Sequence, residues 1–173
     1  MNLHDYFRSI AGYHAWATRK LLDEYLAPLS GEEWRRDCSL FFHSVHGTVN
    51  HLLVTDNIWF ARFAEDHSLR IALDAELHAD RAALCAALRT AVKRWGARLD
   101  TLNVARLDGE LAYTRNNGQA VHLPFATALG HVFNHATHHR GQITAALTAF
   151  GQPGPELDWV YKLQQEMPPG TRA

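Results

Sequence analysis

Four long stretches of the chain carry apolar residues at intervals of three and four, and this periodicity limits the possible folds more than any other feature. They cover residues 3–27, 41–66 and 74–102, and a last stretch from Pro124 to about Phe150. Such spacing places an apolar stripe along one side of an α-helix. Because no other regular segment could cover these stripes, the helices must cover one another. We therefore expect an all-α fold, a four-helix bundle.

Shorter elements are predicted between and after these helices. Residues 111–124 contain two short runs around an Asn-Asn-Gly sequence at 116–118, which predicts a small hairpin before the fourth helix. Ser44 is a suitable N-cap for the second helix. Residues 66–76 lack a sustained period and are expected to form a loop. Residues 156–167 predict a short C-terminal helix.

The length and the cysteine content indicate one ordinary domain. The chain has 173 residues, so we expect a single domain over residues 1–173. A domain of this size buries most of its apolar surface without a structural metal, and a bound metal is therefore expected to be functional. Cys38 and Cys85 are the only cysteines, which fits a reducing cytoplasm.

Charge and hydropathy argue against two classes of partner. The formal net charge is −1 with acidic and basic residues interspersed, which gives no basic footprint for nucleic acid. No apolar run approaches the roughly 18 residues that a membrane span requires. His4, Asp5 and Arg8 fall where a signal peptide would need an apolar core. We expect a cytoplasmic protein that binds a small molecule and contacts neither nucleic acid nor membrane.

Histidines are concentrated in the predicted fourth helix, with four of them in residues 131–139. A helix advances about 100° per residue, so His131, His135 and His139 form a ladder on one side. His135 and His139 can direct their rings at one cation. Catalytic zinc sites usually take three protein ligands and leave one position open. The second helix offers His51 as the third ligand.

The residues around His51 indicate space rather than dense packing. Ser44, Gly47, Thr48 and Thr55 share its helix face, and all four are small or weakly polar. Bulky apolar residues would fill the volume beside an imidazole, whereas these leave it open. We expect a cavity at this position.

Most single histidines on a helix are hydrogen-bonded or exposed residues without a ligand role. Five of the others have no partner at helical spacing and are expected on the surface or in loops: His43, His46, His67, His78 and His122. We expect His14 to be a satisfied core histidine rather than a pocket residue. His131, one turn before the pair, is expected to contact a ligand histidine or to shuttle protons.

The motifs exclude two kinds of metal site. A zincin needs a glutamate directly after the first histidine of the pair, and here Ala136 follows His135. A di-iron bundle needs glutamates that the second and fourth helices lack. Three neutral nitrogens suit Zn²⁺, Ni²⁺ or another borderline divalent ion.

Two segments together resemble a known family. "FFHSVHGTVNHLLVTDNIWFARF" followed downstream by "GHVFNHATHHRGQI" is similar to the DinB/YfiT-like superfamily of small bacterial metal-binding bundles, and "YHAWATRKLL" and "LDWVYKL" extend the likeness over nearly the whole chain. The resemblance implies a four-helix bundle, commonly a homodimer, in which His51, His135 and His139 hold a divalent ion. Thr18 departs from the pattern, since relatives often carry asparagine there.

The resemblance leaves two main hypotheses for the function. Characterised family members include thiol-dependent transferases and isomerases, so the first is a metal-dependent enzyme that performs hydrolysis or thiol-dependent group transfer on a small molecule. It would use Zn or Ni and possess a site for a low-molecular-weight thiol. The second is a non-catalytic stress-response module that binds a metal or a ligand. A structural dimer without metal is the third.

The sequence also predicts the environments of Arg140, two tryptophans and both cysteines. Arg140 falls inside the apolar stripe of the fourth helix, and a buried guanidinium needs a carboxylate or carbonyl partner. Either it has one or the stripe is partly a subunit interface, and we favour the first. Trp16 and Trp59 are expected in the core rather than in a substrate wall. Cys38 and Cys85 lack a paired base and are expected to be inert.

Overall fold

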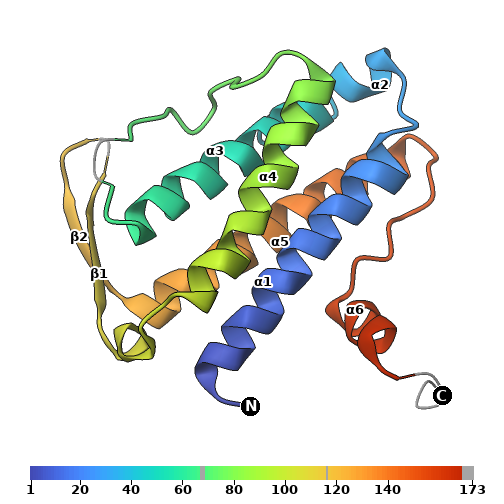
Figure 1. Cartoon of the computed structure of the whole chain (residues 1–173). Helices are drawn as coiled ribbons and strands as arrows, with labels where there is room; N and C mark the ends of the chain where they lie inside the picture. Colours follow the sequence, from blue (N-terminus) through green and yellow to red (C-terminus); the bar gives the residue numbers. More distant parts are fainter. Residues whose placement is uncertain (67–68, 116, 169–173) are drawn as a thin grey trace.

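The computed structural model shows a mostly helical chain with one small two-stranded sheet (Figure 1). The structure describes residues 1–66, 69–115 and 117–168. Within them no helix is long and apolar enough to cross a bilayer. The long helices are α1 (Leu3–Lys20), α3 (Val45–Phe63), α4 (Arg81–Asp100) and α5 (Phe125–Ala149), and the short ones are α2 (Gly31–Arg35) and α6 (Trp159–Glu166).

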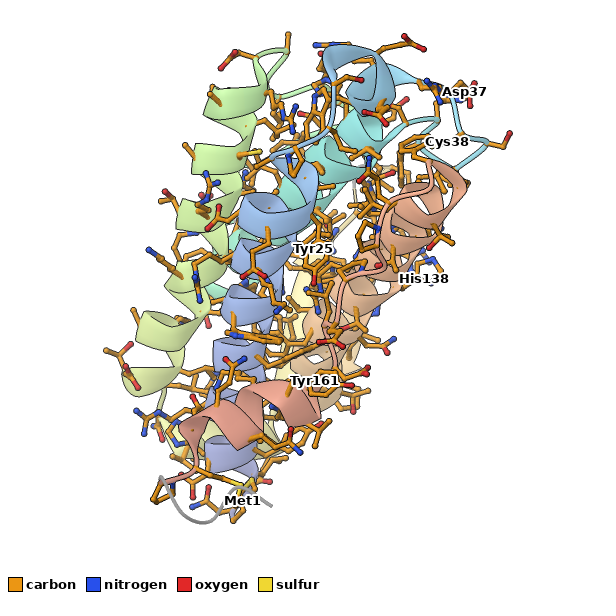
Figure 2. All side chains as sticks on the ribbon, turned by 90° about the vertical axis from the view of Figure 1, so that its right-hand side faces the viewer. Met1, Tyr25, Asp37, Cys38, His138 and Tyr161 are labelled. Carbon is orange, nitrogen blue, oxygen red and sulfur yellow. The ribbon has the colours of Figure 1, made fainter. Side chains whose placement is uncertain are left out.

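The four long helices pack against one another, and α4 and α5 each contact both α1 and α3 (Figure 1). A π-helical turn, Leu21–Leu26, continues α1, so the first predicted helix has nearly the expected length but a wider last turn. Helix α6 contacts α1, where Trp159 stacks on Tyr13. Figure 2 shows α6, marked by Tyr161, at the same end of the molecule as Met1.

The core consists of two apolar clusters with polar residues between them. One contains Phe7, Trp95 and Phe133, and the other is built around Leu22 and Ile143. On two helices, buried polar residues fall between these clusters: His14 and Thr18 on α1, and Thr55 and Asp56 on α3. Buried Arg140 on α5 donates hydrogen bonds to His14 and Thr18. The helices therefore place a polar layer in the middle of the protein.

The predicted hairpin is present. Strand β1 (Glu110–Thr114) pairs antiparallel with β2 (Ala120–Pro124), and β1 contacts α3. Gly118 has a φ of +83°, which glycine adopts without a steric penalty, whereas Asn116 of the predicted turn lies outside the described residues. Pro124 ends β2 and is the N-cap of α5, one position before its predicted place in the first turn.

Side-chain caps define the starts of two long helices. The Ser44 hydroxyl accepts a hydrogen bond from the Gly47 amide, which confirms Ser44 as the N-cap and places the start of α3 at Val45, within the predicted apolar stretch 41–66. The Asp80 carboxylate accepts from the Ala83 amide at 2.7 Å. Helix α4 therefore begins at Arg81 rather than at residue 74.

The segment 69–80 forms no helix or strand, as expected for a loop, but it is fastened across α3. The side-chain amide oxygen of Asn50 accepts hydrogen bonds from the backbone amides of Leu77 and His78. His46 lies 2.7 Å from a carboxylate oxygen of Glu76 and is 6% exposed. The prediction that His46 is a surface residue is wrong, because this segment covers it.

Candidate metal centre

Three histidines from two helices converge at one point. Helix α3 supplies His51, and α5 supplies His135 and His139. One ring nitrogen of each lies within 4.8 Å of the other two, and the Nε2 atoms of His135 and His139 are 3.1 Å apart. The structure thus brings together the three residues that the sequence singled out.

Hydrogen bonds fix the orientation of two of these rings. Nδ1 of His51 donates to the Leu73 carbonyl at 2.7 Å, and Nδ1 of His139 lies 2.7 Å from the amide oxygen of Gln142. Since these acceptors hold the proton on Nδ1, Nε2 of each ring keeps its lone pair. The Gln142 amide nitrogen lies 3.2 Å from Nε2 of His138, which orients the amide. Hydrogen bonds of this kind orient metal-binding histidines in known sites.

The three imidazoles are held in the neutral form. Burial lowers the pKa of His135 to about 3 and that of His139 to about 4, and the neighbouring histidines act in the same direction. Burial also lowers the pKa of His51. Because a metal ligand must be deprotonated, all three are ready to bind a cation at neutral pH.

One side of the group is closed by Phe42, whose ring stacks on His51 with 3.7 Å between centroids. Gly47 makes this possible: a Cβ at that position would lie 2.1 Å from the Phe42 carbonyl oxygen. Gly47 therefore makes room for the backbone at Phe42 rather than for a ligand. Of the four small residues beside His51, Thr55 is the one that lines the cleft described next.

The other side opens into a cleft of about 560 Å³. His51 and His135 form part of its wall, together with Trp59 and His131. Trp59 is partly buried and packs against the apolar cluster that contains Trp95, as expected, and it also lines the cleft. The His131 ring lies 5.5 Å from that of His135, and its pKa is lowered by burial and by Arg62.

Arg140 is buried, 2% exposed, and has partners within its own chain. It donates to Nδ1 of His14 at 3.0 Å and to the hydroxyls of Thr18 and Thr137. The preferred expectation, pairing, is right, but the partners are an imidazole and two hydroxyls rather than a carboxylate or carbonyl. His14 is the satisfied core histidine that was predicted. Thr18, the departure from the family pattern, contributes one of these hydroxyls.

The remaining candidates do not belong to the group. His138 is exposed on the outer side of α5 (Figure 2), although its ring contacts that of His139, and His43 and His122 are also exposed. His67 lies outside the described residues. Burial raises the pKa of both the Cys38 and the Cys85 thiols, as expected for inert cysteines.

Sequence reasoning missed several contributors to the site. Gln142 follows His139 by three residues, a spacing that could have identified it as the residue that orients the ring. Phe42 and the Leu73 carbonyl gave no such signal, because each reaches the site from an irregular segment. Trp59 lies about two turns after His51 on α3, and a substrate wall was the alternative considered for it.

These features define the class of protein: a mostly helical protein with a three-histidine group that could hold a metal ion, two of whose histidines line an open cleft. The chain belongs to the DinB family, whose model matches residues 4–171. Searches among curated proteins and among solved structures gave no match.

Proposed function

We propose that this DinB-family protein is a metal-dependent enzyme that performs hydrolysis or thiol-dependent group transfer on a small molecule. His51, His135 and His139 would hold a divalent ion, with Zn²⁺ or Ni²⁺ best matched to three neutral nitrogens. The scaffold would be a single four-helix bundle domain over residues 1–173. The observation that carries the proposal is the convergence of three ring nitrogens beside a cleft of about 560 Å³, whose wall includes His51 and His135.

The donor set fits such an ion. Each of the two hydrogen-bonded rings presents Nε2, and the two Nε2 atoms on α5 are 3.1 Å apart, close to the separation of two ligands on one small cation. A divalent ion supplies Lewis acidity and lowers the pKa of a water or thiol that it binds. Because His51 and His135 line the cleft, a ligand in the cleft can reach the point where the rings converge.

The residues of the cleft have distinct roles in this proposal. The Leu73 carbonyl and Gln142 hold His51 and His139 in place, so their rings need no rearrangement. His131 lines the same cleft, and its lowered pKa keeps it neutral and able to accept a proton. It is the candidate for proton transfer, as no carboxylate lines the cleft among the described residues.

Metal analysis of protein purified without a histidine tag tests the site. The variants His51→Ala, His135→Ala and His139→Ala are each expected to lose stoichiometric metal. His122→Ala is the control, because His122 is exposed on β2, beside Glu110 and away from the three histidines, and it should keep the metal. Full occupancy in all three variants would overturn the assignment.

A second measurement separates catalysis from binding alone. An enzyme needs an exchangeable water on the bound metal, which paramagnetic relaxation of a Co²⁺- or Mn²⁺-substituted sample detects. A coordination sphere closed by protein atoms favours the non-catalytic stress-response module. A screen of low-molecular-weight thiols against electrophilic substrates then identifies the reaction.

We also propose that the protein is a homodimer, on the basis of the family resemblance. Sedimentation equilibrium tests this directly, because the monomer has a mass of 19.5 kDa. A single species of that mass at micromolar concentration contradicts it.

A further inference from the structure

Two arginines line the cleft that contains His51 and His135. Arg62 is on α3, and Arg115 directly follows β1. Arg62 comes eleven residues after His51, which corresponds to about 16 Å along a helix. The cleft therefore has a histidine end and, beside the hairpin, an arginine end.

The Arg62 guanidinium lies against two aromatic rings that also contact each other. Its central carbon lies 3.9 Å from the centroid of Tyr113 and 4.5 Å from that of Trp59. Among the residues that the structure describes, no carboxylate forms an ion pair with it. Burial lowers its pKa, Tyr113 opposes this effect, and the cations Arg115 and Arg70 act in the same direction as burial.

Such a guanidinium is suited to an anion from outside the chain. Partial burial of a cation beside other cations is unfavourable, and the aromatic faces offset only part of this cost. The planar guanidinium matches a carboxylate with two parallel hydrogen bonds. Apolar side chains, Ile58 and Leu73, complete the wall between the two ends. The volume lies within the range of small-molecule sites, roughly 300 to 1,000 Å³.

We propose that the cleft binds a small organic carboxylate with an apolar body, its carboxylate held by Arg62 and Arg115 at the hairpin end. The apolar body lies along Trp59 toward the histidines. That the opposite end of the ligand reacts at the histidines rests on the proposed function, whereas carboxylate recognition by the arginines does not.

Calorimetric titration of the metal-loaded protein with 2-naphthoate and with the neutral, isosteric 2-naphthamide tests this inference. We expect the carboxylate to bind at least about tenfold more tightly, since ionic hydrogen bonds are lost in the amide. Arg62→Gln should remove this preference. Arg36→Gln is the matched control, because Arg36 also lies over an aromatic ring, that of Phe150, but does not line the cleft.

Three results overturn the inference: equal affinity for both probes, no binding of either at millimolar concentration, or a preference that survives Arg62→Gln. The last result would mean that the carboxylate binds elsewhere, for example on the metal. Metal content is measured on the same samples. If Arg62→Gln keeps the metal content of the wild type but no longer prefers the carboxylate, the inference is supported. The metal content of the histidine variants tests the proposed function and not this inference.

The carboxylate can belong to a thiol compound or to the electrophilic substrate, and competition distinguishes these sources. If glutathione displaces 2-naphthoate and glutathione diethyl ester does not, a thiol compound carries the carboxylate. If neither displaces it, the electrophile carries it. Both outcomes are consistent with an arginine-bound carboxylate.

Discussion

Arg140 donates a hydrogen bond to Nδ1 of His14 at 3.0 Å, and this contact determines the tautomer of a buried histidine. A guanidinium has no acceptor, so Nδ1 of His14 must accept and the ring proton must lie on Nε2. Nε2 then donates to the Asp56 carboxylate at 3.0 Å. Asp56 also accepts from the indole of Trp95 and from Arg94. The negative charge of Asp56 thus compensates the positive charge of Arg140, and the neutral ring of His14 connects the two by hydrogen bonds.

Asp56→Asn should destabilise the protein strongly. The substitution removes the only negative charge in this buried network and leaves Arg140 uncompensated. Removal of one partner from a buried ionic network costs about 3 to 5 kcal/mol, and we expect a loss of this size in the free energy of unfolding by urea. Metal content should be unchanged, because Asp56 does not touch the histidine group.

The control for this prediction is Asp23→Asn. Asp23 pairs with Arg89 on the surface, where an ion pair contributes at most about 1 kcal/mol. If the two variants lose similar stability, Asp56 does not have the role described.

The pH dependence of stability should depend on His14. Burial lowers its pKa below the ordinary value of 6.5, Arg140 acts in the same direction, and Asp56 opposes both. Below pH 6.5 the unfolded chain therefore binds a proton that the folded protein does not. Stability is unaffected above this pH and falls below it, by up to about 1.4 kcal/mol per pH unit.

A non-titrating variant isolates this contribution. Metal-free His14→Gln should lose less stability between pH 7 and pH 5 than the metal-free wild type, as measured by urea unfolding at each pH. The other histidines titrate in both proteins, so their contributions cancel. Identical pH slopes would show that His14 is protonated to the same extent in both states.

The long helices were predictable from sequence because their apolar periodicity reflects the side that is buried. The Ser44 cap made the start of α3 predictable, whereas the start of α4 was not, because good helix formers also occur before its cap, Asp80. The environment of His46 could not be predicted. It depends on the segment 69–80 lying across α3, which Asn50 determines through tertiary hydrogen bonds.

The candidate site was predictable to a similar degree. The spacing of His135 and His139 places them together on any helix, whereas the approach of His51 depended on the family resemblance and on its small neighbours. The cleft is formed by α3, α5 and the hairpin. Its arginine end depends on where Arg115 lies relative to α3, which no local pattern encodes.

Gly47→Ala should disturb the site through the backbone. The added Cβ would lie 2.1 Å from the Phe42 carbonyl oxygen, so the segment must move and the Phe42 ring must leave His51. We expect a loss of about 1 to 3 kcal/mol in unfolding free energy, as for overpacking, together with weaker metal binding. Gly96→Ala on α4 meets no atom within 4 Å and should stabilise the protein by about 0.5 to 1 kcal/mol. Equal effects of the two substitutions would contradict the argument.

Gln142 should control metal affinity without being a ligand. Its amide oxygen accepts from Nδ1 of His139 at 2.7 Å and keeps Nε2 directed at His51 and His135. Gln142→Leu removes this acceptor, and loss of such a contact typically weakens metal binding about 10- to 100-fold. Gln142→Glu retains an acceptor and should recover most of the affinity.

Competition with a chromophoric chelator measures the metal affinity of the wild type and of both Gln142 variants. Because Gln142 is partly exposed, thermal unfolding of the metal-free proteins should be nearly the same. If Gln142→Leu binds metal as tightly as the wild type, the orientation of His139 does not depend on this hydrogen bond.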